Sequence, residues 1–82
     1  MKITLKLYAS LSEYLPSQAR DNTVEIDVPS DASPLDILNR FQVPLAEIHL
    51  VLVNGIFVPP GKRETALAPG DSLAIWPAVA GG

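Results

Sequence analysis

Apolar and polar residues alternate along residues 1–8 and again along residues 23–28. Because successive side chains of a strand point to opposite faces, both segments are predicted to be strands with one buried face. Between them, residues 11–15 follow Ser10, a plausible N-cap, and end at Pro16, so only a short helix is expected there. The two strands then pair as a β-hairpin. Their predicted buried face consists of Ile3, Leu5, Leu7, Val24, Ile26 and Val28.

The main helix is predicted to begin at Ser33. Ser33 is a favoured N-cap residue, Pro34 suits the first helical position, and Asp36 lies near the positive end of the helix dipole. Pro44 closes the helical segment. Its apolar side is expected to carry Leu35, Leu38 and Phe41.

The second half of the chain predicts three further strands. Residues 48–53 are almost continuously apolar, so we expect a strand that is buried on both faces or covered by a partner. Asn54 and Gly55 form a strong hairpin-turn dipeptide that leads into residues 56–58. Residues 72–76 form the last strand, after a loop rich in proline and glycine.

This order of elements predicts an α+β fold. Two hairpins flanking one helix favour a mixed sheet with the helix packed across one face and the first and last strands parallel. That arrangement is the β-grasp, or ubiquitin-like, architecture. Residues 1–77 are therefore expected to form one β-grasp domain, and residues 78–82 a flexible tail.

Composition narrows the classes of function. Of the 82 residues, 48% are hydrophobic and 18% charged, which favours a folded domain over a disordered tail or a membrane protein. A net charge of −3 argues against nucleic acid. The chain has no cysteine and one histidine, His49, so no metal centre is expected. The N-terminus does not resemble a signal peptide, which predicts a cytoplasmic protein. A carrier or subunit without a bound cofactor is favoured over an enzyme.

The strongest candidate for chemistry is the pair of glycines at the end of the sequence. The acidic side chains show no paired spacing typical of general acid–base catalysis. Residues 78–82 can extend about 16 Å, far enough to enter another protein's active site. Gly81 and Gly82 have no Cβ and can pass a narrow channel. The carboxylate is ionised at neutral pH and resists nucleophilic attack, so its use requires activation. An inert terminus remains the alternative.

Several motifs together are typical of one family. They are Tyr8–Glu13 after the opening strand, Val53–Gly55, Pro69–Asp71 leading into Leu73–Pro77, and the ending Pro77–Gly82. With these motifs the chain resembles the MoaD/ThiS family of ubiquitin-like sulfur carriers along essentially its whole length. Ser12, the basic loop 59–66 and Pro77-Ala78 depart from the pattern frequent in the molybdopterin branch.

The resemblance implies a specific role for the terminus. Gly82 would be adenylated by an activating enzyme related to ubiquitin E1, which consumes the ATP, and then converted to a thiocarboxylate. The sulfur would go to a cofactor precursor, with molybdopterin favoured and a molybdopterin synthase large subunit as the receiving partner. A thiamine-type carrier serving a thiazole synthase, a protein modifier conjugated through Gly82, and a noncovalent interaction module are the alternatives.

We also expect contacts with partners upstream of Gly82. Gly81, Ala80 and Val79 would accompany the terminus into the partner. Trp76 has the outward parity of the last strand, beside Tyr8, and both are candidate partner contacts. A local aromatic cluster of these two residues is the competing interpretation.

Overall fold

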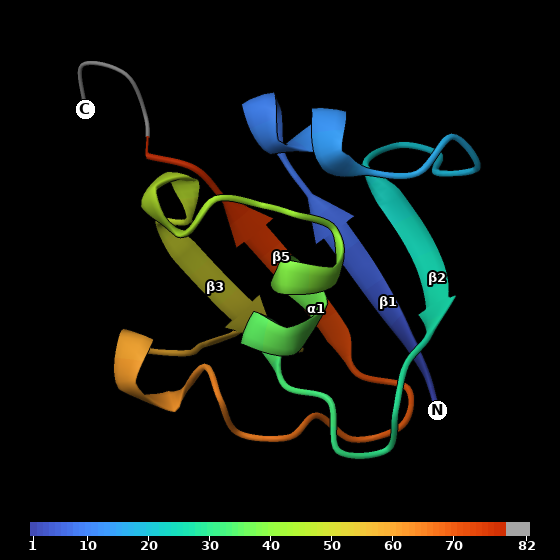
Figure 1. The fold of residues 1–82 in the computed structure, drawn as a ribbon, viewed down its shortest axis with the longest axis vertical. Coiled ribbons are helices and arrows are strands. Elements are labelled where there is room, and N and C mark those ends of the chain that lie inside the picture. The colour runs from blue at the N-terminus through green and yellow to red at the C-terminus, as the bar shows by residue number, and fades with distance from the viewer. Residues whose placement is uncertain (79–82) are drawn as a thin grey trace.

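The computed structural model describes residues 1–78, in which five strands form one sheet and an α-helix crosses one of its faces (Figure 1). The strands and helix are β1 (Lys2–Leu7), β2 (Thr23–Asp27), α1 (Pro34–Arg40), β3 (Leu50–Val53), β4 (Ile56–Phe57) and β5 (Ser72–Trp76). Short 3-10 helices occupy Ala9–Tyr14, Leu45–Glu47 and Pro60–Lys62.

The strand order in the sheet is β2-β1-β5-β3-β4. β1 pairs antiparallel with β2 and parallel with β5, so the first and last strands lie side by side as predicted. β3 pairs antiparallel with both β5 and β4. The predicted α+β class and β-grasp architecture are therefore confirmed, with β5 in the centre of the sheet.

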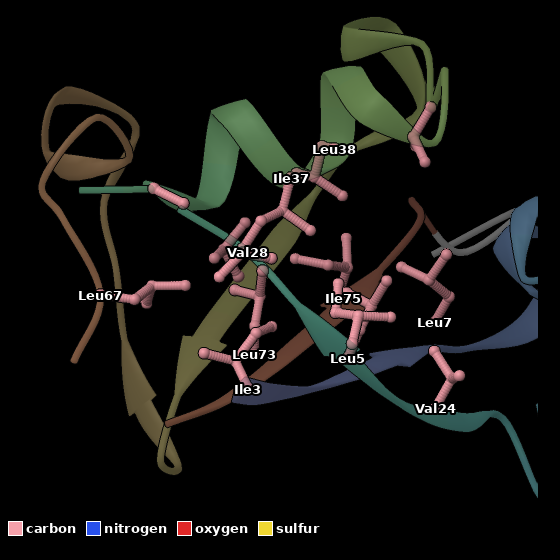
Figure 2. Close-up of a cluster of buried hydrophobic side chains, with 14 of the residues drawn as sticks. Ile3, Leu5, Leu7, Val24, Val28, Ile37, Leu38, Leu67, Leu73 and Ile75 are labelled. Carbon is pink, nitrogen blue, oxygen red and sulfur yellow. The ribbon is translucent and has the colours of Figure 1, made fainter. Parts of the chain in front are cut away.

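The core lies between α1 and the sheet (Figure 2). All six residues predicted for the buried face of the first hairpin are buried, and Leu5 and Leu7 have no exposed surface. The neighbouring strands complete this face with Val51, Leu73 and Ile75. The period-2 pattern of the sequence thus corresponds to one continuous apolar layer.

The helix begins as predicted, but its buried face differs from the prediction. Ser33 Oγ accepts a hydrogen bond from the Asp36 N–H at 3.2 Å, and Asp36 Oδ2 accepts one from the Ser33 N–H at 3.0 Å, which together form a capping box. Leu38 is buried, whereas Leu35 and Phe41 are only half-buried. The residue that points into the core beside Leu38 is Ile37. A helix of seven residues has two turns, so a shift of one position changes which side chains face the sheet.

Two other local predictions were inaccurate. The short helix is a 3-10 helix that starts directly after Tyr8, and Ser10 lies inside it instead of capping it. β3 starts at Leu50, and its residues other than Val51 are half-buried. Residues 1–78 therefore do not bury the strand on both faces, which leaves cover by a partner as the remaining alternative.

Within residues 1–78, no helix combines the length and the apolar content that crossing a bilayer would require.

Candidate functional site: the tail root and the open face of the sheet

Residues 76–78 lie at the end of the central strand, β5 (Figure 1). Two backbone hydrogen bonds hold this point, which we call the tail root (residues 76–78). The Tyr8 N–H donates to the Ile75 carbonyl at 3.1 Å, and the His49 N–H donates to the Trp76 carbonyl at 3.0 Å. The strand is thus fixed from both sides up to the residue before Pro77. The start of the tail has a defined position relative to the sheet.

The remaining predicted site residues in the tail are Val79, Ala80, Gly81 and Gly82, and they lie outside the described residues. Their roles stay predictions, as does the domain boundary between residues 77 and 78.

Tyr8 and Trp76 form a stacked aromatic pair at the tail root. Their ring centroids are 4.4 Å apart and their planes differ by 11°. Parallel pairing of β1 with β5 brings the two side chains to the same level of the sheet. The local aromatic cluster is therefore observed, and such a pair contributes about 0.5–1.5 kcal/mol beyond its buried area. Both rings remain half-buried, so their role as partner contacts stays a prediction.

The stacked pair borders an apolar band on the sheet face opposite α1, which we call the open face. In the register of the sheet, Leu50 lies opposite Trp76, and Leu52 lies opposite both Ala74 and Phe57. Since residues opposite each other in a sheet share a face, these side chains form one band from β5 to β4. Phe57 is 54% exposed at its outer end. The sequence pattern did not reveal this band, because it crosses three strands whose register was unknown.

Acidic groups flank the tail root. The Tyr14 hydroxyl donates to the Glu47 carboxylate, with oxygen–oxygen distances of 3.2 and 3.3 Å. Burial, this hydrogen bond and the charges of Glu47 and Glu13 raise the pKa of Tyr14 above its ordinary value of 10.0. The segments 8–15, 44–50 and 74–78 contain no lysine or arginine. A partner surface around the tail root would therefore meet the negative charges of Glu13 and Glu47, while Lys6 lies opposite Ala74 further along the sheet.

The described part of the chain shows no assembled set of metal ligands. Among residues 1–78, no three histidine, aspartate or glutamate side chains come together in a way that could hold a metal ion. His49 is exposed just before β3, and its backbone N–H and carbonyl make its structural contacts. What the site offers chemically is a fixed strand end beside an apolar surface.

Comparison with known proteins identifies the family. Residues 1–81 match a family described as Mut7-C ubiquitin. The chain belongs to the Mut7-C ubiquitin family. No curated protein matches it significantly.

Solved structures place this Mut7-C ubiquitin chain among ubiquitin-like proteins. The crystal structure of SAMP1 from Haloferax volcanii is 30% identical, with all of both chains covered and a TM-score of 0.71. A second structure, described as the small archaeal modifier protein 1 of H. volcanii, is 29% identical, with 95% of this chain and 98% of that chain covered and a TM-score of 0.68.

A third similar structure is the complex of subunits 1 and 2 of the molybdopterin-converting factor from Helicobacter pylori. It is 17% identical over the whole of both chains, with a TM-score of 0.61, and at this identity it supports the fold. Together with the family match, these similarities confirm the predicted MoaD/ThiS-like, ubiquitin-like protein.

Proposed function

We propose that this chain is a carrier whose C-terminal carboxylate, on Gly82, is activated by adenylation and then transferred to a nucleophile. The observation that supports this most is the tail root: the central strand is fixed on both sides and ends beside an open apolar face. A Gly-Gly sequence follows within six residues of Trp76. Such a domain acts as a substrate of other enzymes instead of catalysing a reaction itself.

The proposed activation converts a poor electrophile into a reactive one. An oxygen of the Gly82 carboxylate attacks the α-phosphorus of ATP, pyrophosphate leaves, and an acyl adenylate forms on an E1-like enzyme. Hydrosulfide then attacks the carbonyl carbon, the bond from this carbon to the AMP oxygen breaks, and AMP leaves with the electron pair. Loss of the sulfur proton gives the thiocarboxylate. No step in this sequence is an oxidation or a reduction.

The acceptor we favour is a cofactor precursor, with molybdopterin as the product. The fold similarity to the molybdopterin-converting factor complex supports a large synthase subunit as the receiving partner. A thiazole synthase-like partner is the thiamine-type alternative. In both cases the protein would work in the cytoplasm, where ATP and the activating enzyme are available.

A protein modifier is the second candidate function, and a specific observation favours it. Sequence identity is higher to SAMP1, at 30%, than to the molybdopterin-converting factor subunit, at 17%. In this route the neutral amine of a lysine attacks the activated Gly82 carbonyl, AMP leaves, and the amine loses a proton to give an isopeptide bond. The activation step is common to both functions.

The open face is the surface on which we expect the activating enzyme and the acceptor protein to dock. Trp76 and Tyr8 would lie against the partner, while Val79, Ala80 and Gly81 lead the terminus into its active site. Half-buried aromatic side chains next to a reactive terminus have the composition typical of interface hot spots. The acidic flank at Glu13 and Glu47 suits a basic entrance on the partner.

Intact mass spectrometry of the protein from its native host tests this proposal. The first measurement establishes whether the mature chain ends at Gly82. Incubation with the cognate activating enzyme, ATP and hydrosulfide should then add the mass difference between sulfur and oxygen. A variant lacking Gly82 and a variant with one alanine added after Gly82 serve as controls, and neither should change in mass.

The same samples distinguish the two functions. A thiocarboxylate without lysine conjugates in cells supports the sulfur carrier, and isopeptides between Gly82 and lysines support the modifier. The absence of both products, with an activating enzyme shown to bind the chain, would refute the proposed function.

A further inference from the structure

A second apolar site lies at the opposite end of β5 from the tail root. An open pocket of about 240 Å³, which we call the far pocket, is formed by α1, β3, β4 and the loop that follows β4. Its lining includes Pro34, Val53, Val58, Lys62, Leu67 and Asp71. Asp71 immediately precedes β5 and Pro77 immediately follows it, so the strand separates the far pocket from the tail.

The far pocket lies at the N-terminal end of the short helix, where Pro34 lines it. Seven residues of α-helix are about 10 Å long, too short to cover all five strands. The loop of residues 59–67 crosses the uncovered end of the sheet without filling it. Buried Arg63 fixes this loop by donating from Nε to the Val58 carbonyl and from Nη2 to the His49 carbonyl, both at 3.3 Å. The pocket is therefore preformed by a tethered loop.

Exposed apolar side chains next to the far pocket extend this surface. Ile56 is 71% exposed and Phe57 is 54% exposed, and they are two of the three most exposed large apolar residues in the described part of the chain. Both belong to β4, and Phe57 also lines the pocket. An apolar pocket with an apolar rim favours a ligand with one large apolar side chain.

Two charged residues, Lys62 and Asp71, line the far pocket, and of these two Lys62 can form a new ion pair with a ligand. Asp71 is already engaged on both oxygens: Oδ1 accepts from Asn54 Nδ2 and Oδ2 from the Ala68 N–H, each at 2.8 Å. Lys62 is exposed, and within residues 1–78 it makes no ion pair. Glu64 lies on the same loop but does not line the pocket. The ammonium of Lys62 is thus the lining charge that remains available to a ligand.

We propose that the far pocket binds an acidic peptide segment of a partner protein, with one aromatic or large aliphatic side chain in the pocket and a carboxylate at Lys62. Two exposed residues and one pocket provide much less contact area than the roughly 800 Å² per partner that a standard protein interface buries. A peptide therefore suits the site better than a second copy of this chain. The proposal is independent of the chemistry at Gly82. It implies that one partner can hold the domain while another acts on the tail.

NMR titration of the isotope-labelled full chain tests this inference. The probe is a capped pentapeptide with a central phenylalanine between two aspartates on each side. We expect a dissociation constant on the order of 1 mM, with amide shifts concentrated at Thr65, Ala66 and Leu67 and absent at Trp76. Replacing the central phenylalanine by alanine should weaken binding at least tenfold, because the buried anchor supplies most of the affinity.

A matched pair of variants tests the role of charge. Lys62→Gln should weaken binding of the acidic peptide about two- to fivefold, the range for one exposed ion pair, whereas Lys6→Gln removes the same charge from β1 and should leave binding unchanged. Equal binding of a peptide with lysines in place of the aspartates would overturn the proposal. Shifts confined to Leu50, Leu52 and Trp76 of the open face would also overturn it. The same holds for the absence of any shift at about 10 mM peptide. Concentration-dependent shifts of the pocket residues without peptide would indicate a second copy and overturn it as well.

Discussion

Asn54 connects the turn between β3 and β4 to the start of β5. Its replacement by alanine should lower the free energy of unfolding more than is usual for an exposed residue. Its Oδ1 accepts from the Ser72 N–H at 2.9 Å, and its Nδ2 donates to Asp71 Oδ1 at 2.8 Å. Asn54 has φ of 52° and Gly55 has φ of 81°, so both are in the left-handed region required by this type of hairpin turn. Asparagine therefore stabilises this turn in two ways: its side chain makes two hydrogen bonds, and it tolerates the left-handed backbone conformation.

The expected loss of stability follows from these contacts. Two side-chain hydrogen bonds contribute about 1 kcal/mol each, and alanine in the left-handed region costs about 1 kcal/mol more. Asn54→Ala should therefore lower the free energy of unfolding by about 3 kcal/mol, against a total of about 4–12 kcal/mol for a domain of this size. The corresponding fall in Tm is about 12–24 °C.

Urea unfolding at 25 °C, followed by the fluorescence of Trp76 and by circular dichroism, measures this loss. The m value should not change, because the surface exposed on unfolding is the same. A double-mutant cycle with Asp71→Ala isolates the contact between the two side chains, and the coupling should be about 0.5–1.5 kcal/mol. A loss below about 1 kcal/mol for Asn54→Ala, or a coupling near zero, would refute the inference that this link stabilises the sheet.

Three further predictions concern the helix, the tyrosine beside the tail root and the aromatic pair. Ile37→Ala should cost about 2–5 kcal/mol in urea unfolding and Leu35→Ala much less, because Ile37 is the buried residue; similar losses would contradict the assigned helix face. The raised pKa of Tyr14 adds stability that is present below pH 10.0 and is lost as pH rises through the folded-state pKa, so Tyr14→Phe should flatten the alkaline part of a stability–pH curve; an unchanged curve would contradict it. Tyr8→Ala should shift the Trp76 emission to longer wavelength and destabilise the domain by at least about 0.5–1.5 kcal/mol, because the buried area of the ring is lost as well, whereas Tyr8→Phe, which retains the ring, should change neither.

The strands were predictable from sequence because the alternation is strong on β1 and β2 and because Asn54 and Gly55 clearly mark the turn between β3 and β4. The helix start was predictable from Ser33 and Pro34. Which side of a two-turn helix is buried depends on how it lies across the sheet, and residue spacing does not determine that. The helix prediction therefore omitted Ile37.

The candidate site was predictable only in part. The stacking of Tyr8 on Trp76 could be anticipated once β1 and β5 were taken as parallel neighbours. The open face could not, because Leu50, Leu52 and Phe57 come together through strand register, which is set by hydrogen bonding between distant segments. Lys62 was identified only as part of a basic loop, since the sequence does not show that a pocket lies beside it.

The parallel pairing of β1 with β5 has a mechanical consequence. If the chain is attached to another protein through its C-terminus, a force between its two ends pulls β1 and β5 in opposite directions along their common axis. The hydrogen bonds of the four paired positions, from Thr4 with Ser72 to Leu7 with Ile75, are then loaded together in shear instead of opening one after another. Forced unfolding depends on the unfolding rate, so this geometry should make the attached domain resistant to pulling. An enzyme that unfolds such a conjugate by pulling on it would unfold this domain late or leave it folded.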